Sequence, residues 1–257
     1  MVLEIKNISK NFGGISALTD VTFTINKGEI YGLIGPNGAG KTTIFNVITN
    51  MYAPSSGEIK FFEQPITGIK PHKITNKGIC RTFQNIRLFS QMTAIENVLV
   101  GGHSRSSSGV LKSVFRTKSQ KLEEEKLQAT AVELLDLVGL SQHHDIIAEN
   151  LAYGQQRRLE IARAMASNPK LLLLDEPAAG MNETETESLF GLIKQVQTRG
   201  ITTLIIEHDM PLVMKLCDRI TVLNFGKKLA EGTPQEIQNN QEVIEAYLGS
   251  EEDDDIA

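Results

Sequence analysis

The distribution of apolar residues along the chain predicts strands of two kinds. Short runs at residues 30–34, 171–174 and 202–206, rich in apolar and β-branched side chains, are typical of strands that are buried on both faces. Residues 2–8 and 21–25 instead alternate between apolar and polar side chains, which predicts an antiparallel β layer with 2–8 as an edge strand. Together these patterns indicate an α/β fold in which a buried core sheet is accompanied by a separate antiparallel layer.

The middle of the chain has a helical pattern instead. Residues 94–100 are predicted as a helix that begins with a capping box formed by Thr93 and Glu96. A long amphipathic helix is predicted over about 118–138, where leucines recur at helical spacing. Between the two, residues 101–109 are rich in glycine and serine and are predicted as a flexible loop. This part of the chain is therefore predicted to be a helical insertion in the α/β domain.

A glycine-rich segment, 35–42, joins the first apolar run to a predicted helix over 43–48. Its glycines let backbone N–H groups converge on a polyphosphate without Cβ clashes, and the N-terminus of the helix adds the positive end of its dipole. In such a phosphate loop, Lys41 is expected to reach the β- and γ-phosphates and the Thr42 hydroxyl to bind Mg²⁺. The predicted phosphate site consists of Gly35, Pro36, Asn37, Gly38, Ala39, Gly40, Lys41, Thr42 and Thr43.

Polar side chains follow the other buried strands directly. Gln84 comes after a predicted strand at 79–83, and Asp175 and Glu176 come after the run of four leucines. The carboxyl ends of such strands form the edge at which α/β folds bind ligands. Asp175 is predicted to lie near Mg²⁺ through water, and Glu176 to orient and deprotonate an attacking water.

Two ring residues allow two interpretations each. His208 follows the strand at 202–206, where a γ-phosphate contact and a purely structural role are equally compatible with the pattern. Phe12 precedes two glycines, so its ring could stack on a purine or pack in the core. The hydrophobic pattern alone does not distinguish these roles.

Composition and charge restrict the class of protein further. The chain has 257 residues, a net charge of −5 and a pI near 5.6, which argues against a dedicated nucleic-acid binder. No apolar run approaches the roughly 18 residues of a membrane helix, and the first residues lack the features of a signal peptide, so a soluble, cytoplasmic protein is expected. Cys80 and Cys217 are predicted as buried thiols, and residues 251–257 as an acidic, disordered tail.

In this order the motifs resemble those of ABC-transporter ATPase subunits over nearly the whole chain. The most specific segment is Leu151-Ala152-Tyr153-Gly154-Gln155, which resembles the LSGGQ signature of that superfamily. The resemblance implies a P-loop NTPase core with an antiparallel β layer, in a single domain over 1–250 that carries a helical subdomain at about 86–165. It also implies that ATP and Mg²⁺ are bound.

The resemblance assigns a role to each candidate residue. Phe12 falls on the aromatic residue that stacks on adenine, and Gln84 on the glutamine that contacts Mg²⁺ and senses nucleotide. Glu176 falls on the catalytic base and His208 on the switch histidine, with Lys41 as the phosphate-binding lysine. The signature residues that would bind the γ-phosphate held by a second subunit are Ala152, Tyr153, Gly154 and Gln155.

Three residues depart from the superfamily pattern. Ala152 stands where the signature has serine and Tyr153 where it has glycine, so the usual hydroxyl contact is absent and backbone N–H groups must replace it. Asn182 stands where the loop after the catalytic carboxylates usually has aspartate, which puts the hydrogen bonds of that loop across the dimer in doubt.

Several stretches narrow the resemblance to one subfamily. Residues 81–89, 150–163, 231–234 and 246–249 closely resemble the ATP-binding subunits of branched-chain amino-acid importers. Such subunits imply a second ATPase subunit, identical or related, two membrane permease subunits and an extracytoplasmic substrate-binding protein, with the chain at the cytoplasmic face of the membrane and no nucleic acid bound. Lipopolysaccharide-export ATPases are the alternative, and ABC ATPases of DNA repair or translation are a third class that usually needs coiled-coil arms or two cassettes.

Overall fold

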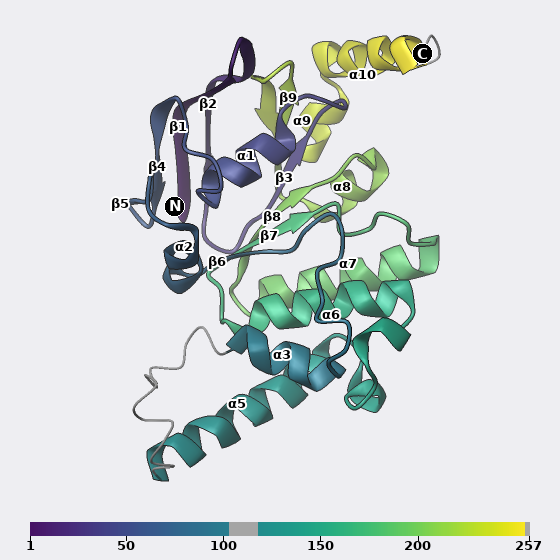
Figure 1. Ribbon diagram of the computed structural model, residues 1–257. Helices are drawn as coiled ribbons and strands as arrows, with labels where there is room; N and C mark the ends of the chain where they lie inside the picture. The colour runs from purple at the N-terminus through teal and green to yellow at the C-terminus, as the bar shows by residue number, and fades with distance from the viewer. Residues whose placement is uncertain (103–117, 255–257) are drawn as a thin grey trace.

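The computed structural model describes residues 1–102 and 118–254, with side chains described over 1–102 and 121–247. Its strands form two sheets that lie face to face (Figure 1). The first is antiparallel and has the order β2-β1-β4-β5, with β1 (Leu3–Phe12), β2 (Ile15–Ile25), β4 (Ser56–Phe61) and β5 (Gln64–Pro65). The second has the order β10-β9-β3-β8-β7-β6, with β3 (Ile30–Ile34), β6 (Ile79–Arg81), β7 (Leu171–Asp175), β8 (Thr202–Ile206), β9 (Arg219–Asn224) and β10 (Lys227–Gly232).

The antiparallel layer corrects one prediction. Strand β1 is not an edge strand, because it pairs with β2 on one side and with β4 on the other, through Leu3–Ile25 and Leu3–Phe61. Its alternating pattern has another cause, since one face of the sheet is buried and the other is exposed to solvent. Alternation reports which faces are buried and says nothing about which strands lie at the edge.

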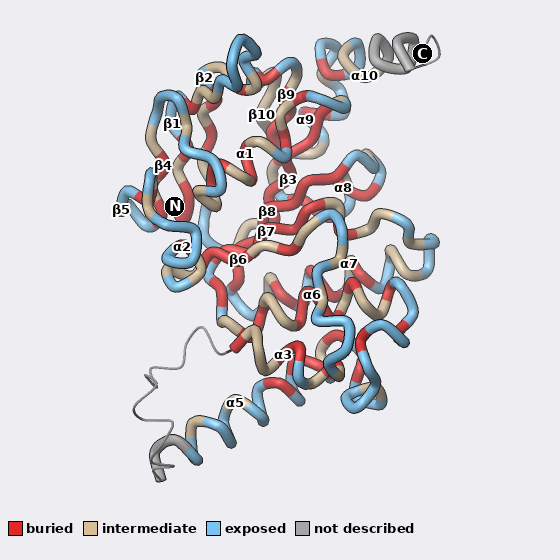
Figure 2. Tube along the Cα trace, viewed as in Figure 1, coloured by how far each residue is buried: buried red, intermediate tan, exposed pale blue. Residues whose placement is uncertain are grey.

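Strands β3, β7 and β8 of the second sheet are buried along their whole length, as predicted, whereas β10 at the edge is half-buried or exposed. Leu171 and Leu173 of β7 face a core shared with the antiparallel layer and α1 (Lys41–Ile48). Leu172 and Leu174 face a second core, built with the helices on the other side of the sheet. Figure 2 shows this continuous buried centre between exposed outer segments. All strands except β10 are parallel to their neighbours in this sheet, so several strands end at the same edge.

The chain between β6 and β7 is helical, in agreement with the pattern of the sequence. It contains α3 (Ala94–Gly102), α5 (Lys118–Leu137) and α6 (Tyr153–Ala166), which form a layer below the sheets in Figure 1, and the short η2 (Ser141–His143) and η3 (Ala148–Asn150). Gly101 and Gly102 belong to α3 and not to the predicted loop, whose other residues lie outside the described part. A Cβ on Gly101 would lie 2.1 Å from the Arg163 carbonyl oxygen, so this glycine allows close packing of α3 on α6.

The remaining helices connect or follow the core strands: α2 (Pro71–Lys77), α7 (Glu183–Thr198), α8 (Met210–Leu216), α9 (Pro234–Gln238) and α10 (Gln241–Asp254). Helix α10 includes the first acidic residues of the segment predicted to be disordered, and 255–257 lie outside the described residues. Cys80 and Cys217 are buried free thiols, as predicted. Within the described residues, no helix has both the length and the apolar composition needed to cross a membrane.

Candidate functional site

The register of the parallel strands brings the predicted site residues to one edge of the sheet. Leu33 of β3 lies opposite Ile206 of β8, and Ile206 lies opposite Asp175 of β7. The segments that leave these strands therefore start side by side. They carry the phosphate loop after β3, Glu176 after β7 and Glu207 with His208 after β8.

The phosphate loop has a backbone that only glycine adopts readily. Gly35 has a φ of 147°, and a Cβ there would lie 2.1 Å from the Leu223 carbonyl oxygen. The loop leads directly into α1, which begins at Lys41, as expected for a helix whose N-terminus faces the phosphates. No side chain caps the N-terminus of α1 and its first turn holds no acidic residue, so its N–H groups and its dipole are suited to an anion.

Lys41 is a buried cation whose hydrogen bonds, among the described residues, go to the loop itself. Its Nζ donates to the carbonyl oxygens of Gly35 at 2.6 Å and Pro36 at 2.9 Å. Burial lowers the pKa of Lys41, and the charges of Glu176 and Asp175 act in the opposite direction. None of the ion pairs between described residues includes Lys41. A phosphate group beside it would supply the missing counter-charge.

Asp175, the predicted outer ligand of Mg²⁺, is held by an arginine that the sequence did not single out. Its Oδ2 accepts from Arg81 Nη2 at 2.7 Å, and both side chains are buried. Arg81 also donates from Nη1 to Asn46 Oδ1 of α1 at 2.7 Å, so β6, β7 and α1 are joined at this point. The metal role of Asp175 stays a prediction, and no cluster of three His, Cys, Asp or Glu side chains suited to a metal occurs in the described part of the chain.

Glu176, the predicted base, is in direct contact with Gln84, the predicted nucleotide-sensing glutamine. Gln84 Nε2 donates to Glu176 Oε2 at 2.8 Å, although the residues are far apart in the sequence. Glu176 has a φ of 46°, and its N–H donates to the Ile206 carbonyl oxygen at 2.9 Å. The left-handed backbone turns the chain sharply at the end of β7. The fold thus presents a carboxylate and an amide together, next to the phosphate loop.

Arg157 of α6 lies beneath this pair and was not predicted. Its side chain is completely buried. The guanidinium donates from Nη1 to the Phe83 carbonyl oxygen at 2.6 Å and from Nη2 to that of Gln84 at 2.7 Å. It also lies 3.4 Å from the Glu176 carbonyl oxygen. A polar residue at a buried position of an amphipathic helix is the only sequence signal that could have indicated it.

His208 reaches the same edge and is exposed. Its side chain is 62% exposed, and Nδ1 lies 4.0 Å from Glu207 Oε2. Both sequence neighbours of His208 form structural contacts. Glu207 is buried and accepts from the Ala178 N–H at 3.0 Å. Asp209 caps α8 by accepting from the Leu212 N–H. Burial raises the pKa of Glu207. Glu207 is thus buried, whereas His208 and Asp209 are both exposed, and the Asp209 side chain is engaged as the cap of α8.

Phe12 lies at the end of β1 and is 42% exposed, which removes core packing as an explanation. Its ring meets Tyr52 edge to face, with centroids 5.1 Å apart, and Lys10 Nζ lies 4.9 Å from its centroid. Two neighbours therefore hold an exposed aromatic ring at the end of β1. Adenine stacking itself stays a prediction.

The signature segment forms the exposed N-terminus of α6. The Ala152 N–H donates to Gln155 Oε1 at 3.0 Å, and Tyr153 is 47% exposed. Tyr153 packs beside Gly180, where a Cβ would lie 3.3 Å from its Cε1, and a Cβ on Gly154 would lie 2.8 Å from Glu185 Oε1. Tyr153, the bulky residue at the third signature position, therefore lies beside the loop that leads into α7.

Asn182, the third departure, has a role within the chain. Its side chain accepts from the Glu185 N–H at 3.0 Å, and Glu185 Oε2 accepts from the Asn182 N–H at 3.1 Å. These reciprocal bonds cap α7.

The C-terminal helix also reaches the phosphate loop. Tyr247 of α10 packs against the second core, and burial raises its pKa to about 12, while a hydrogen bond with the Gly35 backbone acts against that rise. Because Tyr247 and Gly35 lie far apart in the sequence, no local sequence pattern predicts this contact.

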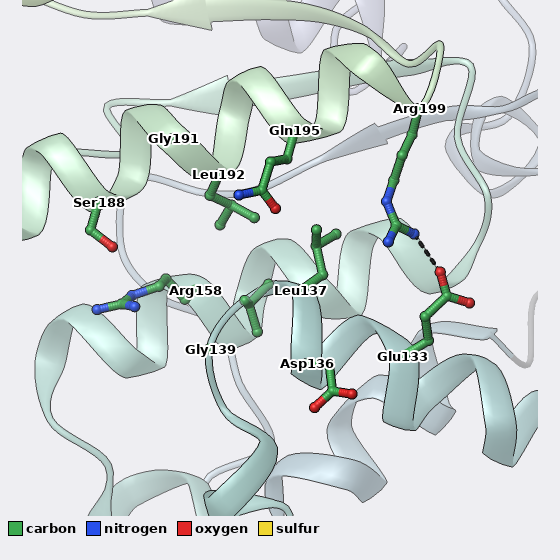
Figure 3. Close-up of a pocket in the computed structure, with 11 residues that line it drawn as sticks. Glu133, Asp136, Leu137, Gly139, Arg158, Ser188, Gly191, Leu192, Gln195 and Arg199 are labelled. Carbon is green, nitrogen blue, oxygen red and sulfur yellow. Dashed lines mark hydrogen bonds and ion pairs between the residues drawn. The ribbon is translucent and has the colours of Figure 1, made fainter.

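A separate pocket of about 400 Å³ lies between α5, α6 and α7 (Figure 3). An ion pair between Arg199 and Glu133, 2.7 Å long, crosses one end of it. None of the predicted nucleotide or metal residues lines it; the lining residues are Glu133, Asp136, Leu137, Val138, Gly139, Arg158, Ser188, Gly191, Leu192, Gln195 and Arg199.

The fold and the site at the strand ends define the class of protein to which this chain belongs. A glycine-rich loop between a parallel strand and a helix, with a buried lysine and with carboxylates on the neighbouring strand, is the arrangement of a P-loop nucleoside triphosphatase. Within that class, the family model described as ABC transporter matches residues 18–179. A second model, described as branched-chain amino acid ATP-binding cassette transporter, matches residues 227–253. The chain belongs to the ABC transporter family and is an ABC ATPase, which confirms the resemblance inferred from its motifs.

Individual relatives agree with this assignment. The high-affinity branched-chain amino acid transport ATP-binding protein BraF of Pseudomonas aeruginosa is 45% identical over 96% of this chain and 98% of its own. The ADP conformation of an ATP-binding cassette of an ABC transporter has a TM-score of 0.84 at 34% identity, covering 96% of this chain and 98% of that one. A dimeric cassette in a post-hydrolysis state, bound to ADP and Pi, has a TM-score of 0.76 at 26% identity. The match covers 90% of this chain and 98% of that chain.

Proposed function

We propose that this chain is the ATP-hydrolysing subunit of an importer for branched-chain amino acids. The observation that carries the hydrolytic part is the contact between Gln84 Nε2 and Glu176 Oε2 beside the phosphate loop. The transported class follows from the match over 227–253 and from the relatives' names. The transported amino acid itself would be handled by other subunits.

The residues at the sheet edge divide the work of hydrolysis. The phosphate loop and Lys41 bind the β- and γ-phosphates of ATP, which is the substrate, and Phe12 stacks on its adenine. Glu176 accepts a proton from the attacking water, whose position Gln84 and His208 help to define. General-base assistance of this kind contributes about 10²–10⁴ in rate.

Mg²⁺ fits the residues present at this edge. The exposed Thr42 hydroxyl lies in the first turn of α1, and Asp175 and Gln84 lie near the neighbouring strand ends. Mg²⁺ commonly uses only one or two protein oxygens, together with waters and substrate phosphates, so the lack of a carboxylate cluster among the described residues is compatible with it. When bound, the ion would offset the negative charge of the phosphates.

Two subunits are needed to complete the site. The N-terminus of α6, with Ala152 and Tyr153, is exposed and belongs to the helical layer below the sheets, whereas the phosphate loop lies above that layer in Figure 1. A second ATPase subunit, either another copy or a related chain, would present this helix N-terminus to the γ-phosphate. The dimeric state of the related cassette supports this arrangement. ATP then stabilises the dimer, and hydrolysis weakens it.

The membrane partners would bind an exposed apolar surface on the helical layer. Phe89, Met92, Ile146 and Ile147 are all exposed, and an antiparallel bridge between Thr93 and Ile147 brings their segments together. We expect two permease subunits to dock here, with an extracytoplasmic substrate-binding protein on the far side of the membrane. The chain would thus lie peripherally on the cytoplasmic face, since an ATPase must have access to cytoplasmic ATP.

The substitution Glu176→Gln tests the hydrolytic role. Glutamine keeps the shape and can still contact Gln84 but cannot accept a proton, so we expect normal ATP binding, at least 100-fold slower turnover and an ATP-bound dimer that persists. A steady-state ATPase assay and size-exclusion chromatography with ATP, ADP or no nucleotide measure these effects.

The matched control is Glu183→Gln, in the exposed first turn of α7. It should hydrolyse ATP at the wild-type rate. Wild-type turnover in Glu176→Gln would contradict the assignment of the base, while an inactive variant that stays monomeric with ATP would contradict the dimer mechanism for the isolated chain.

A further inference from the structure

Arg157 connects the signature helix to both segments that carry the proposed water-handling residues. Its two terminal nitrogens donate to the carbonyl oxygens of Phe83 at 2.6 Å and Gln84 at 2.7 Å. The Glu176 carbonyl oxygen lies 3.4 Å from Nη2. Since the Gln84 side chain donates to the Glu176 carboxylate, main-chain and side-chain contacts form a closed ring through the three residues.

The charge of Arg157 is balanced locally. Glu160, one helical turn further along α6, is also buried and lies 3.1 Å from Nη1. Its other oxygen accepts from the Arg87 N–H at 3.2 Å, which fixes the segment just after Gln84. Burying an ion pair is costly, and apolar residues of similar volume often stabilise a core at least as well. The pair is therefore poorly explained as a device for stability alone.

A guanidinium suits this position because of its shape. Its planar fork presents several N–H groups in fixed directions, whereas the single ammonium of lysine is a point donor on a flexible stem. The carbonyl oxygens of Phe83, Gln84 and Glu176 come from two separate loops, and only the planar guanidinium can contact all three. A lysine would keep the charge opposite Glu160 without spanning these acceptors.

We propose that Arg157 is a positioning residue that fixes the main chain at Phe83, Gln84 and Glu176 relative to the signature helix. A displacement of α6 would then move Gln84 and Glu176 together, so that the state of one helix controls whether the base is in place. This proposal rests on the proposed function for the role of Glu176. It concerns the mechanical link from α6 to the base, and not the docking of α6 on a second subunit.

The substitution Arg157→Lys tests the link, with Arg158→Lys as the matched control. Arg158 is the next residue of α6, but it lines the separate pocket of Figure 3. For Arg157→Lys we expect turnover to fall on the order of 10- to 100-fold, since misplacement by about 1 Å can cost that much. ATP affinity should stay within about threefold, because the phosphate loop is untouched. Arg158→Lys should match the wild type in both.

Hydrogen exchange measured by mass spectrometry on the full chain distinguishes positioning from general destabilisation. In Arg157→Lys, exchange should accelerate in peptides that cover 83–89 and 176–180 and stay unchanged over 30–48. If Arg157→Lys does not fold, the double variant Arg157→Gln/Glu160→Gln removes both buried charges and takes its place.

Unchanged exchange over 83–89, acceleration spread evenly over the chain, or wild-type turnover would each overturn the proposal. The exchange measurement does not depend on hydrolysis. It therefore decides this proposal even if Glu176→Gln shows that the proposed base is wrong.

Discussion

Lys41 carries a charge that the protein pairs only with backbone carbonyls, as far as the described residues show. Those carbonyls belong to Gly35 and Pro36, in the same loop that would hold the phosphates. Burial lowers its pKa because the charged form loses hydration. An anionic ligand would reverse this effect, so the residue is suited to binding phosphate and less suited to a structural role.

Replacement of Lys41 by alanine should therefore weaken ATP binding strongly. Hydrogen bonds to charged groups contribute about 1.5–3 kcal/mol, which corresponds to roughly a 10- to 150-fold loss of affinity. A nucleotide titration measures this loss, with Lys60→Ala on β4 as the control, because the ion pairs that Lys60 forms with described residues involve surface carboxylates. Unchanged affinity in Lys41→Ala would show that the phosphate-loop assignment is wrong.

At the scale of single elements, the start of α7 explains a departure that the sequence left open. Asn182 puts the hydrogen bonds of this loop across a dimer in doubt, and within the chain its side chain caps α7 through the Glu185 N–H. Asparagine is as good an N-cap residue as aspartate. Glu185 also approaches Gly154 of the signature segment, so the cap holds the α7 N-terminus against the N-terminus of α6.

Loss of this cap should destabilise the protein measurably. Asn182→Ala removes the acceptor and should lower the free energy of unfolding by about 0.5–2 kcal/mol. Asn182→Asp keeps the acceptor and should change the free energy of unfolding far less. Urea unfolding compares the two, and equal stability of Asn182→Ala and the wild type would mean that the cap contributes nothing in solution.

At the scale of the whole molecule, the nucleotide site and the exposed apolar surface lie on different parts of the protein. The phosphate loop lies at an edge of the sheets, while the exposed apolar residues Phe89, Met92, Ile146 and Ile147 lie on the helical side of the chain. In the segment after Gln84, the apolar side chains of Ile86, Leu88 and Phe89 are candidates for contact with a permease. Leu88 packs against the core, however, and Phe89 is the exposed member of the three.

Phe89→Ser is therefore a cleaner test of docking than a substitution that includes Leu88. It should reduce co-purification of the chain with its membrane subunits and leave the ATP affinity of the isolated chain unchanged. The control is Leu122→Ser on α5, because Leu122 is 53% exposed and Phe89 is 46% exposed. This variant should leave the complex intact. If Phe89→Ser still assembles and supports transport of labelled leucine at the wild-type rate, the docking surface lies elsewhere.

The sequence by itself determined the local elements and the chemistry at their ends. The runs at 30–34, 171–174 and 202–206 became strands buried on both faces, because runs rich in apolar and β-branched residues require cover on each side. The phosphate loop, Glu176 and His208 could be named because each follows such a strand directly. Periodicity also predicted the helical segment between β6 and β7 and nearly the full extent of α5.

The tertiary structure alone decided which of these ends meet and what supports them. The place of β1 within its sheet, the contact of Gln84 with Glu176, the pairing of Arg81 with Asp175 and the position of Arg157 all join residues that are distant in sequence. Hydrophobic periodicity reports whether a position is buried, but it carries no information about the partner across the interface. Buried charges in particular depend on geometry, since Arg157 and Asp175 are tolerated in the interior only where the fold supplies acceptors or an opposite charge.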